Sequence, residues 1–335
     1  MEREKNVFKR RIWRIKGGSY ITSLPKDWVE KNKLEEIYII EDFDGNLKII
    51  NPLTEKEKHV IIEVEKFKDP STLEYSVLTS YMQGADKISV ISKDVIDLNI
   101  KKRLRDLKNE LIGADIIQDK SDSIVYQILL DISAYPINDT IIGFNSFISD
   151  IHNDTVVAVK EYNKRLANEI LDRVKDGVRK YRFMIRQIAI ASQNVPIAKK
   201  IGINNYRHTI IYGVVASHLN RILHHTAAVN NHLLRIEAKD DVANDYIIKM
   251  AEHASRMRDD SVNALVKKDI TLATNVIKLM GIQRNLEEEL LNYLFTGKVS
   301  QRNAVSYSMM GREFRRVSGY AVGISDAVGN LVLVP

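Results

Sequence analysis

The sequence contains no cysteine among its 335 residues. Disulfides, zinc ribbons, iron–sulfur clusters and thiol nucleophiles are therefore excluded. The sequence also lacks any uninterrupted run of about 18 apolar residues, the length that a membrane-spanning helix needs. Residues 1–5 lead into no apolar stretch of the kind found in signal peptides. We therefore expect a cytoplasmic protein with no membrane insertion.

The positive charge of the chain is concentrated at one end. The net charge is +6, and residues 1–33 alone hold ten basic side chains against four acidic ones. Subtracting these from the 50 basic and 44 acidic residues of the chain leaves 40 of each, so the remainder is balanced. Gathered Lys and Arg side chains release counterions from phosphates, which favours a nucleic-acid partner. A solvated basic tail and a weak surface for anionic lipid are the alternatives.

Residues 8–52 predict four short strands and one helix. Their order is strand 11–15, strand 19–24, helix 26–32, strand 36–42 and strand 47–51. Gly17-Gly18 predicts a tight hairpin between the first two strands, and Pro25 suits the first turn of the helix. So few residues enclose too little apolar surface to be stable alone. We therefore expect a dimer that shares strands between chains.

The segment from Arg11 to Val29, with its core Gly-Gly-Ser-Tyr…Leu-Pro-Lys-x-Trp, resembles the SpoVT/AbrB swapped-hairpin DNA-binding family. The resemblance implies an intertwined dimer that presents basic hairpins to double-stranded DNA. It departs at Glu35-Glu36, where the family usually carries Gly-Asp. The positions carried over to the DNA face are Lys9, Arg10, Arg11, Arg14, Lys16, Ser19, Tyr20 and Lys26.

Two pairs of side chains in this segment have alternative roles. Arg11 and Arg14 are three apart on a strand and so point to opposite faces, and one of them is free to brace the dimer. Trp13 and Trp28 are able to stack on bases, but their places beside the hairpin and at the helix start favour packing in a core.

The middle segment, residues 54–138, predicts a small α+β domain. The expected order is strand 58–65, helix 70–82, strand 87–91, helix 94–111, strand 115–117 and strand 124–128. The pattern contains no nucleophile beside a base and no glycine-rich phosphate loop. We therefore expect a spacer or a second dimer contact, and not an enzyme.

The last part of the chain predicts two three-helix bundles, over 139–240 and 241–335. The expected helices are 144–165, 166–193, 207–236, 244–267, 270–296 and 302–332. Apolar residues follow steps of three and four from Tyr212 to Ile236 and from Met310 to Leu331. Superimposing these two seams gives an internal repeat with an offset of 95 residues, in which Leu219 corresponds to Phe314.

This repeat resembles the fold of PhoU, a regulator of phosphate uptake, and the fusion to a SpoVT/AbrB-like head resembles archaeal phosphate uptake regulators. The PhoU resemblance implies an acidic signature in each bundle whose two carboxylates help to bind metal clusters. Here those positions are Asn220 and His224 in the first repeat and Arg315 and Gly319 in the second. A further acidic position falls on Arg179. We therefore predict degraded metal sites and no cofactor.

Histidines recur every seven residues at His218, His225 and His232. At 1.5 Å per residue they lie about 10.5 Å apart along a helix, too far for two of them to share one ion. We interpret them as residues that flank a half-buried seam, with a pH-sensitive interface as the alternative. His224 has a second alternative, a meeting with His152 or His253 across helices.

Together these patterns predict a multidomain α+β chain with a swapped-hairpin head over 1–53, the middle domain, and an all-α PhoU-like pair of bundles. The main hypothesis is a dimeric DNA-binding transcriptional regulator linked to phosphate homeostasis. The alternatives are a PhoU-like cytoplasmic adaptor for a phosphate transporter or signalling protein, and a low-specificity DNA-organising protein of the nucleoid. Double-stranded DNA and a second copy of the chain are the expected partners.

Overall fold

The computed structural model describes residues 7–51 and 57–333. The chain forms two compact units, residues 1–56 and 57–335. The first unit contains, in the predicted order, β1 (Trp13–Arg14), β2 (Tyr20–Ile21), α1 (Lys26–Asn32), β3 (Tyr38–Glu41) and β4 (Leu47–Ile50). β1 pairs with β2 and β3 with β4, both antiparallel. Positive φ angles at Gly17 (108°) and Gly18 (90°) make the tight turn of the first hairpin.

The first unit has no apolar core in a single chain. Among residues 7–51 no apolar side chain is buried. Trp13 is 49% exposed and its cross-strand neighbour Ile21 is 51% exposed, while Trp28 is half-buried. The predicted core packing of Trp13 is therefore wrong for one chain, because two short hairpins cannot enclose an indole.

The second unit begins with the predicted α+β domain. Its elements are β5 (His59–Glu63), η2 (Val64–Lys66), α2 (Pro70–Met82), β6 (Lys87–Ile91), α3 (Leu98–Leu107), η3 (Lys108–Glu110), β7 (Ala114–Lys120) and β8 (Ser123–Ile128). The sheet has the order β5-β6-β8-β7, with β5 parallel to β6 and the other pairs antiparallel. α3 starts four residues later than predicted because the Asp97 carboxylate accepts from the backbone N–H groups of Asn99 and Ile100.

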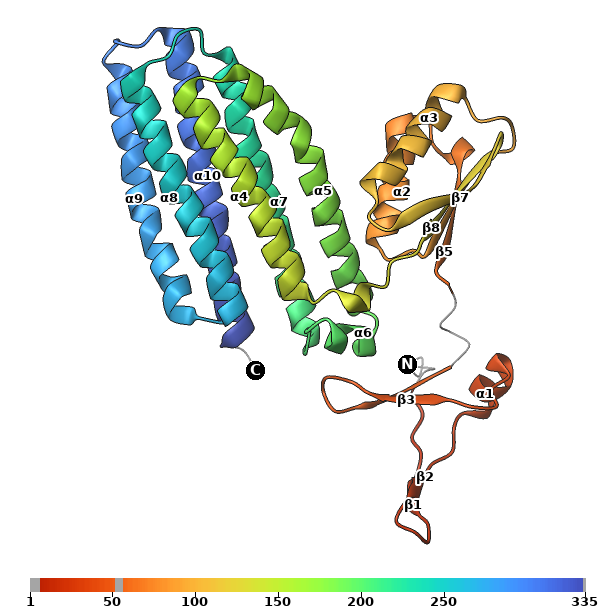
Figure 1. Cartoon of the computed structure of the whole chain (residues 1–335). Coiled ribbons are helices and arrows are strands. Elements are labelled where there is room, and N and C mark those ends of the chain that lie inside the picture. The colour runs from red at the N-terminus through yellow and green to blue at the C-terminus, as the bar shows by residue number, and fades with distance from the viewer. Residues whose placement is uncertain (1–6, 52–56, 334–335) are drawn as a thin grey trace, which may run out of the picture. The chain divides into compact units, whose positions relative to one another are not determined.

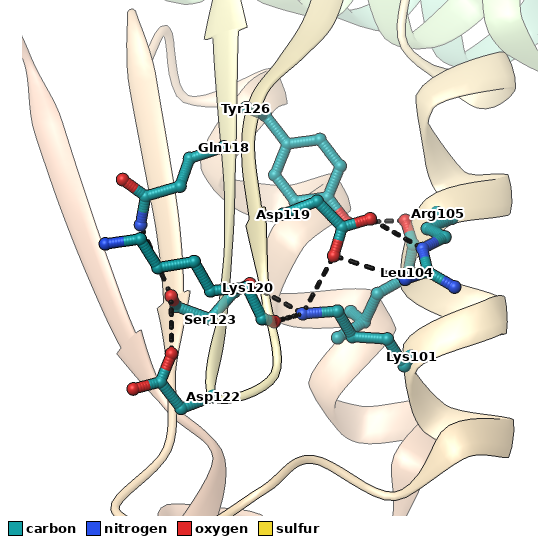
Figure 2. Close-up of polar contacts among 9 residues, drawn as sticks. All are labelled: Lys101, Leu104, Arg105, Gln118, Asp119, Lys120, Asp122, Ser123 and Tyr126. Carbon is teal, nitrogen blue, oxygen red and sulfur yellow. Dashed lines mark hydrogen bonds and ion pairs between the residues drawn. The ribbon is translucent and has the colours of Figure 1, made fainter.

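One face of this sheet carries α2 and α3 (Figure 1). Leu73 and Leu104 of the two helices meet Ile88 and Tyr126 of the central strands in a buried apolar cluster. At the β7–β8 turn, the buried ammonium of Lys101 contacts the carbonyl oxygens of Lys120 and Ser123 (Figure 2). The helix thereby holds the hairpin turn as well as the sheet.

The helical half follows a short turn, η4 (Ile132–Ala134). Its helices are α4 (Ile137–Glu161), α5 (Lys164–Ala191), α6 (Val195–Lys200), α7 (Tyr206–Arg235), α8 (Asp241–Lys267), α9 (Ile270–Phe295) and α10 (Gln301–Val332). The short α6 was not predicted. α4 starts seven residues before the predicted 144 because Pro136 sets its N-terminus, and it ends where Tyr162 takes a left-handed φ of 55°.

The two predicted seams are confirmed. Every residue of the series from Tyr212 to Ile236 and from Met310 to Leu331 is buried. α7 packs along α10, while α4 packs on α8, so the two repeats meet through corresponding helices. Among residues 7–51 and 57–333, no helix combines the length and the apolar character needed to cross a bilayer.

A buried arginine joins the middle domain to the helical half. Arg186 of α5 donates to the carbonyl oxygens of Tyr81 (2.9 Å) and Ala85 (2.7 Å) at the C-terminal end of α2. Its guanidinium also lies 3.4 Å from the Asp86 carboxylate and 5.1 Å from the centre of the Tyr81 ring. The Tyr81 carbonyl also accepts from the backbone N–H of Gly84, so the guanidinium adds a second donor at the turn that ends α2 and ties this turn to α5.

Candidate functional site

The residues predicted to contact DNA are all exposed in the first unit. They are Lys9, Arg10, Arg11, Arg14, Lys16, Ser19, Tyr20 and Lys26. Arg14 lies directly opposite Tyr20 in the β1–β2 register. Because side chains alternate along a strand, Arg14 and Tyr20 share one face of the hairpin.

The hairpin cations have few acidic neighbours. Lys26 pairs with Glu30 one turn along α1 at 3.5 Å, and Arg10 stacks over the Phe8 ring at 5.6 Å. Within residues 7–51 and 57–333, neither Arg11 nor Arg14 forms an ion pair with a carboxylate. Their charge is therefore available to an external anion.

The positions that the resemblance assigned to the PhoU acidic signature lie on α7 and α10. Asn220 is half-buried, and its Oδ1 has no hydrogen-bond partner within the described residues. His224 is exposed, and so is Gly319, where an added Cβ would meet no atom within 4 Å. Arg315 forms an ion pair of 2.6 Å with Glu287 of α9. In the part of the chain that the structure describes, no three His, Asp or Glu side chains come together closely enough to hold a metal ion.

The alternative in which His224 meets His152 or His253 is not found within the described residues. His152 is fully buried on α4, with its Nε2 2.9 Å from the carbonyl oxygen of Ala251. Burial and the nearby Arg258 lower the pKa of His152 to about 3, so this ring is neutral. His253 instead contacts Gln283, with 3.0 Å between Nδ1 and Oε1. His152 and His253 thus each contact a different partner on a neighbouring helix.

The α7–α10 seam holds a buried acid that sequence reasoning missed. Glu313 of α10 lies between two α7 histidines, with its Oε2 2.5 Å from His225 Nδ1 and its Oε1 3.8 Å from His232 Nε2. Tyr320 stacks on the His225 ring at 5.4 Å and contacts His218 at 5.5 Å. Burial by itself would raise the pKa of Glu313, but the hydrogen bond from His225 and the nearby His232 outweigh it and lower the pKa to about 2. The only sign of this buried acid in the sequence is that Glu313 directly precedes Phe314 of the apolar seam.

Comparison with known proteins identifies the helical half. The family model described as PhoU domain matches residues 247–328. No curated protein matches the chain. Among solved structures, PhoU from Pseudomonas aeruginosa is similar with a TM-score of 0.51 and 17% identity, covering 59% of this chain and 95% of that one. The phosphate transport system regulatory protein PhoU from Streptococcus pneumoniae has a TM-score of 0.48 and 15% identity, covering 58% and 92%. Residues 247–328 thus match the PhoU domain, and the helical half of this chain is similar in fold to PhoU.

Proposed function

We propose that this chain is a PhoU-type regulatory adaptor, not an enzyme, whose helical half engages a phosphate transporter or its signalling partner. The observation that carries the proposal is the PhoU domain over residues 247–328, set in a helical half that is similar to almost the whole length of a solved PhoU. Such a protein would act in the cytoplasm. The PhoU-type metal positions have lost their acids, so its contacts would not depend on bound metal.

Phosphate uptake in living cells tests the adaptor function. Deleting the chain should raise phosphate uptake in phosphate-rich medium, and restoring it should lower uptake again. The double variant Arg11→Ala/Arg14→Ala separates the two halves of the chain, because it leaves the helical half intact. If this variant restrains uptake like the wild type, the adaptor function is independent of the head. Unchanged uptake after deletion would contradict the proposal.

We further propose that residues 7–51 bind double-stranded DNA as a dimer, which gives the chain a second, regulatory activity at the nucleoid. Support comes from the exposed Arg11, Arg14 and Lys16 and from the resemblance to SpoVT/AbrB hairpins. The exposed Trp13 and Ile21 supply apolar surface that a second chain can cover.

Duplex binding at several salt concentrations tests this activity. Arg11→Ala/Arg14→Ala should weaken binding and reduce the salt slope by about one for each phosphate that the arginines no longer neutralise. The control Lys31→Ala/Lys48→Ala removes two exposed charges outside the β1–β2 hairpin and should weaken DNA binding much less. A preferred site that survives at about 0.2 M salt indicates a transcriptional regulator, whereas binding without preference indicates a DNA-organising protein. If the wild type and both double variants bind DNA with equal affinity, the β1–β2 hairpin is not the DNA-binding surface.

A further inference from the structure

A pocket lies where the middle domain meets the helical half, and we call it the junction pocket. Its cavity measures about 340 Å³, which is within the size range of small-molecule sites. The middle domain contributes Ile112 and Leu130, just before β7 and just after β8. The helical half contributes the first turns of α4 and two residues of α5, Lys180 and Phe183. A molecule bound here would therefore contact both parts of the chain.

Three aromatic side chains line the junction pocket. Phe144 is 1% exposed and Phe183 is 6% exposed, so both rings are held in the core beneath it. The more exposed Tyr135 ring meets Phe183 edge to face, with 5.6 Å between the ring centroids and 85° between the ring planes. Aromatic rings pack best against other flat rings, in offset or edge-to-face contact. The walls therefore favour a ligand with an aromatic ring.

Buried contacts fix the walls of the junction pocket on both sides. In the helical half, the fully buried amide of Gln187 donates to the backbone carbonyl of Tyr135 at 2.8 Å. In the middle domain, Gly113 has a φ of 79°, and an added Cβ would lie 2.5 Å from the Cβ of Leu130. A glycine at this position therefore lets Leu130 take its place in the wall. The fold itself sets the walls, so a ligand would enter a preformed site.

Two side chains of opposite charge line the junction pocket. Asp139 is in the first turn of α4, where the positive end of the helix dipole favours a carboxylate. Lys180 lies in the middle of α5, with its ammonium 5.7 Å from the centre of the Phe147 ring. Its neighbour Arg182 pairs with Glu110 at 2.6 Å, whereas Lys180 has no carboxylate partner in the described part of the chain. Lys180 thus leaves a positive charge at the pocket for an acidic ligand group.

We propose that the junction pocket binds a small aromatic anion, with its ring among Tyr135, Phe144 and Phe183 and its acidic group on the ammonium of Lys180. The ring of such a ligand would lose water-exposed apolar surface, and its acidic group would accept a charge-assisted hydrogen bond. Because both parts of the chain form the walls, the bound ligand also holds the middle domain to the helical half. The site uses neither the basic head nor the positions of the acidic signature, so it does not depend on the proposed function.

Two naphthalene probes of opposite charge test the class of ligand. Calorimetry on the full chain compares naphthalenesulfonate with naphthylmethylammonium, which share the ring and differ in the sign of the charge. We expect saturable binding of the sulfonate and much weaker binding of the ammonium compound. Tighter binding of the ammonium compound would overturn the assignment of an anion. If neither probe binds, the junction pocket is not a site for an aromatic ligand.

A variant that fills the junction pocket shows whether the sulfonate binds there. Gly143 lines the pocket, and an added Cβ would meet no atom within 4 Å. Gly143→Leu places a side chain in this space, and leucine favours a helix more than glycine does, so the fold should be kept. We expect the sulfonate to bind about tenfold more weakly or not at all, as when a ligand's ring loses its apolar contacts. Gly281→Leu, at an equally open position on α9, is the matched control and should bind like the wild type. Equal affinity of both variants would overturn the junction pocket as the site.

Charge variants test the role of Lys180. Lys180→Met keeps a long side chain without the ammonium and should weaken binding of the sulfonate by about tenfold. Asp139→Asn removes the acid of the same pocket and should not weaken it. Lys175→Met, at an exposed position on α5, is the control and should bind like the wild type. If Lys180→Met binds the sulfonate as tightly as Lys175→Met does, the assignment of the acidic group to Lys180 is overturned.

Discussion

The guanidinium of Arg315 lies 2.6 Å from the carboxylate of Glu287 and joins α10 to α9 within the PhoU domain. Arg315 stands where the resemblance to PhoU places the first acid of its metal-binding signature. The positive charge of Arg315 neutralises the Glu287 carboxylate and would repel a metal ion at this position. Gly319, one turn along α10, offers no side-chain donor.

We therefore expect the purified chain to hold less than one equivalent of iron, zinc or magnesium, measured by elemental analysis after dialysis. The variant Arg315→Glu/Gly319→Asp should gain divalent-cation binding by calorimetry, because it sets two carboxylates one turn apart beside Glu287. Arg316→Glu, an exposed neighbour, is the matched control and should gain none. Stoichiometric metal in the wild-type chain would contradict this account.

The buried Lys101 should be essential to the middle domain. Its ammonium lies 2.6 Å from the carbonyl oxygen of Ser123 and 3.1 Å from the Asp119 carboxylate. Lys101→Met removes the charged donor of the Lys120 and Ser123 carbonyls at the buried hairpin turn, so we expect a loss of about 3 kcal/mol in the free energy of unfolding. Arg105→Met, which removes the more exposed partner of Asp119, should cost less than about 1 kcal/mol. Urea unfolding checks both, and equal losses would show that Lys101 has no special role.

Arg186 should control how firmly the middle domain is held to the helical half. Arg186→Met would remove the guanidinium donor from the carbonyls of Tyr81 and Ala85, and the Tyr81 carbonyl would keep only the backbone N–H of Gly84. We expect faster amide hydrogen exchange over residues 79–86 and at the facing part of α5, with little change in α8. Arg182→Met removes a 2.6 Å ion pair with Glu110 from the same helix and serves as the control. Exchange that changes equally in both variants would argue against a specific cap.

Glu313 should make the α7–α10 seam sensitive to strong acid. Its pKa is lowered from 4.5 to about 2, so its contribution to stability is complete above pH 4.5 and is lost as pH falls toward 2. The stability difference between wild type and Glu313→Gln should therefore shrink across this window. Glu289→Gln, at an exposed position on α9, should show no such trend. Thermal unfolding from pH 5 to 2 measures it, and a constant difference would count against the histidine contacts.

Much of the architecture was predictable because it depends on local patterns. The spacing of apolar residues by three and four predicted the seams of α7 and α10, and every seam residue is buried. Helix ends were less accurate where a single cap decides them, as at Asp97 and Pro136. The short helix α6 was missed because six residues carry too little periodicity.

The sequence by itself determined the order of strands and helices, the buried seams and the confinement of the net positive charge to the first 33 residues. These are properties of neighbours along the chain. Only the tertiary structure decided that Glu313 lies between His225 and His232 and that Arg186 contacts the turn at the end of α2. His225 and Glu313 are 88 positions apart, and Tyr81 and Arg186 are 105 apart. No local pattern encodes which side chain at such a distance will meet a buried charge.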